Sequence, residues 1–186
     1  SEILQYIGEN EKIHNEKADS LYSGMVVDTN NFMNKTGVRT FEAAAFLRRN
    51  GADVTRVRKL FREDADEYKA KADAVSQAEI YRDRYAISIM KNDDIQSPTI
   101  IGAQAANELL NIKGVRASFV CTDYQNKVYV SARSIDEVNV QIIMERLGGG
   151  GHMSSAGCQI DGMSLEEAVD VVKDEIDKMI EEGELS

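Results

Sequence analysis

The N-terminal part of the chain, up to Phe61, has the hydrophobic spacing of short amphipathic helices. Its apolar side chains recur three and four positions apart, which places them on one face of a helix. The segments with this spacing are residues 1–17, 21–27, 41–49 and 54–61. Thr40 stands where it can cap the third segment, and Asn50-Gly51 is typical of a helix end. This part is therefore predicted to be helical.

A polar, alanine-rich segment follows. Residues 63–83 mix acidic and basic side chains at helical spacing, which is typical of an exposed helix supported by side-chain pairs. We interpret it as a connector helix between two domains. The predicted division of the chain is therefore residues 1–62, a connector at 63–83, and a second domain at 84–186.

The periodicity changes after Arg84 from helical to strand-like. Short β-prone runs at residues 85–90, 117–122 and 127–134 predict strands, and the four residues between the last two predict a hairpin. Helices are predicted at 99–110, where Pro98 begins the helix, at 138–147, and after Ser164, which forms a capping-box pattern with Glu167. The predicted fold class is therefore α/β, with a small mixed sheet flanked by helices. The order of the strands in the sheet cannot be predicted from the sequence.

Charge narrows the choice of ligands. The net charge is −10, and most of it lies in residues 161–186, where ten acids face two lysines. A protein that binds long nucleic acid needs a basic stripe, so such a partner is not expected. A small phosphate-containing ligand in a local pocket stays compatible with this charge.

The compartment is expected to be the cytoplasm. Cys121 and Cys158 are too few for a disulfide framework, which favours a reducing environment. The sequence has no apolar run of membrane-spanning length and no signal-peptide pattern near its beginning.

Four consecutive glycines followed by a histidine are the most distinctive motif. Gly148 to Gly151 exceed what a helix end needs, and glycines let a ligand approach the backbone closely. Successive backbone N–H groups can converge on an anion, and His152 adds a donor. The motif predicts a phosphate-contacting loop; a flexible linker is the alternative.

Other candidate residues carry weaker signals. Strand alternation places Ser131 and Arg133 on one face of a sheet, where a hydroxyl and a guanidinium can bind phosphate or a base edge, although an ordinary strand could carry both. Asp28 emerges from an apolar segment and can bind a hard metal, or simply form a turn. Asn139 lies near the start of the helix predicted at 138–147 and is uninformative alone. His14 is expected to face solvent.

Several separated segments together resemble the DHH–DHHA1 phosphoesterases, and within them the cyclic-di-AMP phosphodiesterase branch. The segments are MVVDTNNF at residues 25–32, RTFEAA at 39–44, SARS at 131–134 and NVQIIMERLGGGGH at 139–152. The resemblance covers nearly the whole chain. It implies that residues 1–62 are the end of a DHH domain and residues 84–186 a DHHA1 domain.

The resemblance also implies roles for individual residues. Gly149, Gly150, Gly151 and His152 would contact phosphate, and Ser131, Arg133 and Asn139 would position the nucleotide. Family members hold two manganese ions, and Asp28 corresponds to one of their ligands. The Asp-His-His triplet that names the family is absent, as are the family's earlier metal-binding aspartates. Full manganese binding and turnover by this chain alone are therefore not expected.

The leading interpretation is the substrate-binding portion of a manganese-dependent phosphodiesterase that converts cyclic-di-AMP to pApA. Alternatives are a phosphoesterase acting on short oligonucleotides or single strands, a non-catalytic nucleotide-binding module, and an assembly element. The implied partners are the cyclic dinucleotide and the missing N-terminal half of the DHH domain, and the apolar helices leave a homodimer open. By resemblance, the chain would be the cytosolic part of a membrane-anchored bacterial protein.

Overall fold

The computed structural model describes residues 14–33, 36–91, 95–135 and 138–185. The chain divides into two compact units, Ser1–Glu63 and Asp64–Ser186. No helix in these four described ranges is long and apolar enough to cross a membrane.

The first unit consists of helices, as the periodicity predicts. They are α2 (Asn15–Asp28), α3 (Val38–Arg49) and α4 (Val54–Leu60). Ala18, Leu47 and Ala52 form its small buried core. The apolar segment at 21–27 lies within α2, whereas most of the helix predicted over 1–17 lies outside the described residues. His14, at the start of α2, is exposed as expected.

The predicted start of α3 is wrong by three residues. The helix begins at Val38 with Gly37 as its N-cap, and Thr40 lies inside the first turn. The Thr40 hydroxyl accepts a hydrogen bond from the Gly37 backbone N–H at 3.3 Å, so it acts from the third helical position. The helix ends at Arg49 as predicted, and Gly51 follows with a φ of +96°.

A buried carboxylate joins α2 to the start of α4. Asp19 Oδ1 accepts from the Asp53 backbone N–H at 2.7 Å, and its Oδ2 accepts from Arg56 Nε at 2.6 Å. Asp19 is buried, with 8% of its surface exposed. The hydrogen bond from Arg56, followed by that from the Asp53 backbone, lowers the pKa of Asp19 below its usual value.

We expect Asp19→Asn to destabilise the first unit at neutral pH. Because the folded-state pKa of Asp19 is lowered, its stabilising contribution is complete above the ordinary value of about 3.9 and is lost as the pH falls further. Urea unfolding should therefore separate wild type from Asp19→Asn at pH 7, and the gap should narrow near pH 3. A variant as stable as wild type at pH 7 contradicts this role.

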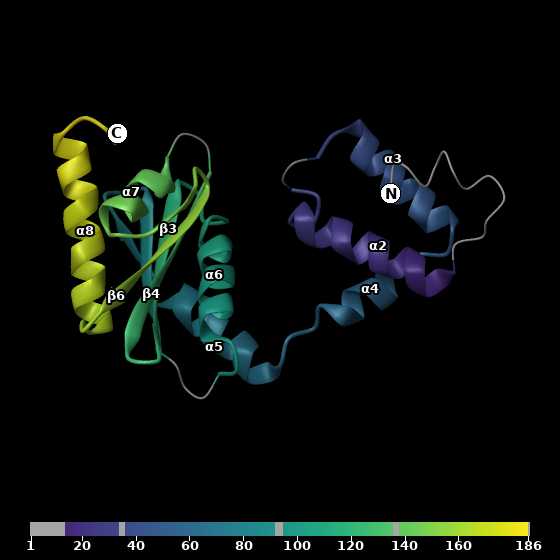
Figure 1. Ribbon diagram of the computed structural model, residues 1–186, viewed down its shortest axis with the longest axis horizontal. Helices are drawn as coiled ribbons and strands as arrows, with labels where there is room; N and C mark the ends of the chain where they lie inside the picture. The colour runs from purple at the N-terminus through teal and green to yellow at the C-terminus, as the bar shows by residue number, and fades with distance from the viewer. Residues whose placement is uncertain (1–13, 34–35, 92–94, 136–137, 186) are drawn as a thin grey trace. The chain divides into compact units, whose positions relative to one another are not determined.

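The second unit is built on one six-stranded sheet in the order β1-β2-β3-β4-β6-β5 (Figure 1). The strands are β1 (Glu79–Tyr81), β2 (Tyr85–Met90), β3 (Ala117–Tyr124), β4 (Lys127–Ser134), β5 (Gly150–His152) and β6 (Ser155–Asp161). Only β2 and β3 pair in parallel; the other neighbours are antiparallel. The mixed sheet confirms the predicted fold class.

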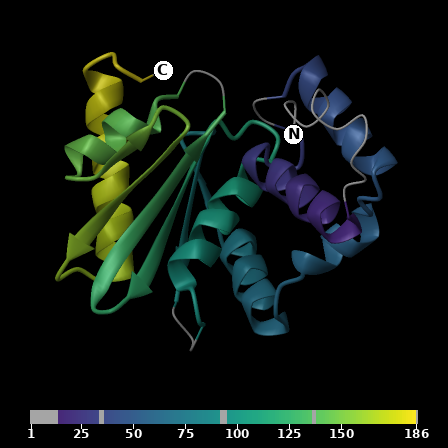
Figure 2. The ribbon, with the colours of Figure 1, turned by 45° about the vertical axis from the view of Figure 1, so that its right-hand side comes forward.

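Helices cover the two faces of this sheet unequally (Figure 2). On one face, α7 (Val140–Arg146) and α8 (Leu165–Glu181) share a core with β2, β3, β4 and β6. On the other face, α5 (Ala65–Ser76) and α6 (Pro98–Leu109) pack on β2 and β3. Side chains of β4 and β6 on this second face stay partly exposed. The edge formed by β4, β6 and β5 therefore presents an open surface.

The helix predicted over residues 63–83 is too long. It ends at Ser76, and Glu79–Tyr81 forms β1 instead, paired with β2 across a turn in which Arg82 and Asp83 have positive φ. Ala74 of α5 is buried in the core shared with α6, so this helix packs within the second unit. The three-part domain division stays a prediction.

The remaining predicted elements of the second unit match closely. The strands at 85–90 and 127–134 have the predicted bounds, and the hairpin turns at Gln125 and Asn126 with φ of 52° and 59°. Pro98 begins α6, and the Ser164–Glu167 capping box begins α8. Helix α7 starts at Val140 rather than at residue 138, because Asn139 is its N-cap.

Candidate functional site

The sheet register brings three polar side chains into one row on the open face. Arg133 of β4 pairs with Ser155 of β6, and Ser155 pairs with His152 of β5. Directly paired residues on neighbouring strands carry their side chains on the same face. His152 therefore lies on the same face as Arg133, although the two are far apart in the sequence.

The adjacent row contains residues with little or no side chain. Ser131 pairs with Gly157, which pairs with Gly150. Because side chains alternate along a strand, Ser131 and Arg133 share this face, as predicted. The two glycines leave the backbone of β5 and β6 uncovered beside the Ser131 hydroxyl. This arrangement suits a ligand that lies directly on the sheet.

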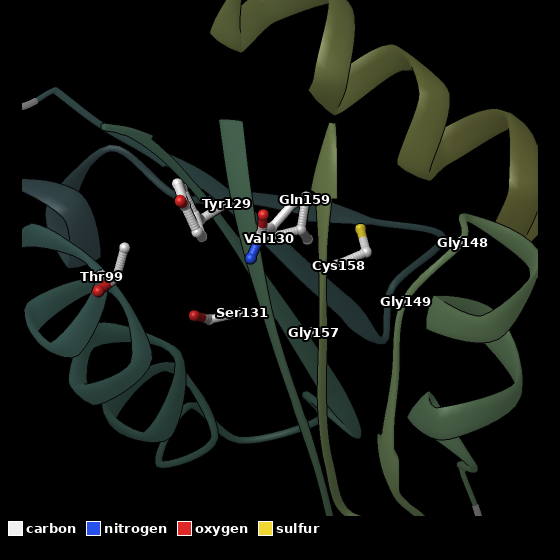
Figure 3. Close-up of a pocket in the computed structure, with 9 residues that line it drawn as sticks. All are labelled: Thr99, Tyr129, Val130, Ser131, Gly148, Gly149, Gly157, Cys158 and Gln159. Carbon is white, nitrogen blue, oxygen red and sulfur yellow. The ribbon is translucent and has the colours of Figure 1, made fainter. Parts of the chain in front are cut away.

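A pocket of about 410 Å³ lies along this open face. Figure 3 shows the Ser131 hydroxyl pointing toward α6, with Thr99 of α6 opposite it. Its lining residues are Thr99, Tyr129, Val130, Ser131, Gly148, Gly149, Gly157, Cys158 and Gln159. The pocket joins two of the predicted site residues, Ser131 and Gly149, to residues of α6, β4 and β6.

Gly150 and Gly151 lie in the edge strand β5, so the flexible-linker alternative is wrong. Two glycines of the run are required by close packing. A Cβ on Gly149 would lie within 2.5 Å of Cys158 Cβ, and one on Gly151 would lie 2.5 Å from Ala156 Cα. Gly151 also has a φ of +150°, which other residues rarely adopt. Gly150, in contrast, has no atom within 4 Å of an added Cβ.

Arg133 supplies a positive charge at this face, and no carboxylate of the described residues neutralises it. The side chain is half-buried, and burial lowers the pKa of its guanidinium. Its Nη1 donates to the Ala132 carbonyl oxygen at 2.8 Å, and no carboxylate in the described ranges forms an ion pair with it. A guanidinium stays charged at neutral pH, and a desolvated charge without a counter-ion is costly. An anionic ligand would supply the missing partner.

Asn139 lies beside the turn that follows His152. Val140, its neighbour, donates its backbone N–H to the Met153 carbonyl oxygen at 3.0 Å. The Asn139 Oδ1 accepts from the Gln141 backbone N–H at 3.1 Å, so this oxygen caps α7. The side-chain NH2 group of Asn139 does not take part in capping α7. In the structure Asn139 is thus the N-cap of α7. The contact of Asn139 with a nucleotide stays a prediction.

Asp28 belongs to the other unit. It is the last residue of α2 and its side chain is exposed. Within the described part of the chain, no group of three or more His, Cys, Asp or Glu residues could hold a metal ion. The described residues therefore do not form a two-metal centre. Asp28 as a ligand to metal held mainly by other residues stays a prediction.

Sequence reasoning missed Thr99, Tyr129, Gly157 and Gln159, which also line the pocket. The alternation along β4 was sufficient to place Tyr129 beside Ser131. Gly157 and Gln159 face the pocket because β6 inserts between β4 and β5, which is a property of the strand order. Thr99 depends on how α6 packs over the sheet.

Comparison with known families decides the classification. Residues 82–182 match the DHHA1 domain. The chain belongs to the DHHA1 family. The match includes every element of the sheet from β2 onward and all the site residues that the resemblance predicted in this unit.

Two curated relatives resemble the chain along almost its whole length. It is 42% identical over 185 residues to the cyclic-di-AMP phosphodiesterase GdpP of Bacillus subtilis, covering 98% of this chain and 28% of that protein. It is 43% identical over 169 residues to the cyclic-di-AMP phosphodiesterase PdeA of Listeria monocytogenes, covering 90% of this chain and 26% of that protein. The chain thus spans little more than a quarter of either relative.

A solved structure shares the fold. An exopolyphosphatase-related protein from Bacteroides fragilis superposes with a TM-score of 0.83 at 22% identity, over 95% of this chain and 54% of that chain. At this identity the likeness shows that the two chains share a fold.

Proposed function

We propose that this DHHA1 chain is the substrate-binding part of a phosphodiesterase that hydrolyses cyclic-di-AMP to pApA. The observation that carries the proposal is the half-buried Arg133, which has no ion-pair partner among the described residues, beside an open pocket on the sheet. The relatives named cyclic-di-AMP phosphodiesterases support the choice of ligand. In this proposal a phosphate of the dinucleotide lies against Arg133 and His152, and Ser131 hydrogen-bonds to the nucleotide.

The edge strand β5 contributes backbone rather than side chains. Gly150 adds no side chain to the open face, so a ligand can approach β5 closely there. His152 follows two residues later on the same face and is exposed, so its imidazole is accessible to a phosphate oxygen. Binding of this kind needs no charged group beyond Arg133 and is compatible with an acidic protein.

The hydrolysis step would require metal ions, which we propose to be manganese held mainly outside the described residues. Two metal ions activate water and stabilise the charge of the transition state in such phosphodiester cleavage. Because the described residues do not form a metal centre, no hydrolytic step is assigned to this chain. Its proposed task is to bind and orient the dinucleotide.

Calorimetric titration of the chain with cyclic-di-AMP, pApA and a short RNA, with and without manganese, tests this function. We expect binding that does not depend on metal and that favours the cyclic dinucleotide. Preference for the short RNA would support the oligonucleotide alternative instead. Binding of none of the three contradicts the proposal that this chain alone forms the substrate site.

A further inference from the structure

The pocket extends beyond the residues assigned to phosphate binding. Tyr129 of β4 pairs directly with Gln159 of β6, so both side chains lie on the open face. Figure 3 shows these two side chains next to each other at one end of the pocket, with Thr99 facing them from α6. Neither Tyr129 nor Gln159 has a role in the proposed phosphate contacts. This end of the pocket therefore holds an aromatic ring and an amide that take no part in the proposed phosphate binding.

The strand geometry separates this end from the phosphate end by a suitable span. Tyr129 lies four residues before Arg133 on β4, and a strand rises about 3.4 Å per residue, so the two positions are about 14 Å apart. Ser131 lies midway on the same face. A nucleotide whose phosphate contacts Arg133 can lie along the strand with its base over Tyr129.

The Tyr129 ring is held in place by its neighbour. Its centroid lies 6.0 Å from that of Tyr124, with an interplanar angle of 56°, which is a favourable tilted contact. The Tyr124 hydroxyl in turn accepts from Gln125 Nε2 at 3.0 Å. An aromatic side chain held in this way suits base stacking, which favours every base to a similar extent.

Gln159 can distinguish adenine from guanine, which stacking alone does not do. Its side chain is exposed and it makes no hydrogen bond among the residues that the structure describes. A glutamine amide can bind adenine through two bonds, accepting from N6–H and donating to N7. Guanine presents acceptors at both O6 and N7, so one bond is lost and an oxygen faces an acceptor whichever way the amide is turned.

We propose that Tyr129 and Gln159 form an adenine-binding subsite, in which Tyr129 stacks on the base and Gln159 reads its N6/N7 edge. This rests on the proposed function, because the phosphate must lie near Arg133 for the base to reach this end. Gln159 is then a determinant of adenine specificity, and Tyr129 is a determinant of affinity.

The test measures affinity of the chain for cyclic-di-AMP, for cyclic-di-GMP and for a cyclic-di-AMP analogue with 7-deazaadenine. Wild type should prefer cyclic-di-AMP about tenfold or more over both other ligands, as one lost bidentate base contact predicts. Gln159→Ala should bind the three with nearly equal affinity. Tyr129→Ala should weaken all three about tenfold, and Tyr129→Phe should restore most of that loss.

Gln77→Ala is the matched control, since Gln77 lies outside the pocket and donates to the Ile89 carbonyl oxygen. It should keep the wild-type preference. Gln159→Ala that also keeps this preference overturns the subsite while leaving the proposed function intact. A wild type that binds none of the ligands overturns both. The deaza analogue tests the N7 contact on wild type, so this part does not depend on a variant that folds.

Discussion

Gly149→Ala is expected to destabilise the second unit by about 3 kcal/mol or more, which corresponds to a fall in melting temperature of about 10 °C. The added Cβ would lie within 2.5 Å of Cys158 Cβ and closer still to the Gly157 carbonyl oxygen. Since one of these neighbours is backbone of β6, only a shift of β5 or β6 can relieve the clash. Thermal unfolding followed by circular dichroism measures the effect.

Gly150→Ala is the matched control for this substitution. An added Cβ there has no atom within 4 Å and the φ of Gly150 is not in the left-handed region, so stability should change by less than about 1 kcal/mol. The Cβ would point to the open face, in the row of Ser131, and cyclic-di-AMP binding should weaken even though the protein stays folded. Equal melting temperatures for Gly149→Ala and Gly150→Ala would contradict the close packing of β5 on β6.

Arg133→Ala is expected to weaken cyclic-di-AMP binding about thirtyfold, or about 2 kcal/mol, because it removes a charge-assisted hydrogen bond to phosphate. Folding should change little, since no ion pair of the described residues depends on this guanidinium. Arg133→Lys should recover part of the affinity, because an ammonium keeps the charge and loses the forked geometry. Calorimetric titration gives the affinities.

Lys127→Ala separates this local contact from the general effect of charge. Lys127 lies on the same face of β4, and it already pairs with Asp161 at 3.0 Å. Its replacement removes the same formal charge about 20 Å along the strand. Lys127→Ala should leave the affinity within about twofold of wild type. An equal loss in Lys127→Ala and Arg133→Ala would mean that long-range charge, and not a contact at Arg133, governs binding.

Much of the fold follows from local sequence signals. Strand β2, strand β4 and the hairpin turn between β3 and β4 are predicted because β-prone runs and turn residues mark them without tertiary context. The capping box of Ser164 and Glu167 marks the start of α8 equally well. Because local residues determine these elements, the sequence alone is sufficient to predict them.

The missed strands depend on pairing. Glycines have a low propensity for strands, so Gly150–His152 becomes β5 only because β6 accepts its backbone at close range. The short segment Glu79–Tyr81 becomes β1 because the following turn folds it onto β2. Neither event leaves a local pattern in the sequence.

The candidate site likewise combines a feature that local sequence predicts with features that depend on strand pairing. Alternation predicts that Ser131 and Arg133 share a face, and the register confirms it. That His152 joins them depends on the order β4-β6-β5, and the pocket also needs α6 packed against the sheet. The resemblance to DHH–DHHA1 proteins named these residues together, while only the register explains physically why they meet.

The most direct test of a ligand site on the open face of the sheet is an amide chemical-shift titration of the labelled chain with cyclic-di-AMP in the absence of metal. We expect the largest shifts on the open face of β4, β6 and β5, at Gly150, His152, Ser131, Gly157 and Gln159. Shifts confined to the α7 and α8 face, or to the first unit, would contradict a binding site on this sheet.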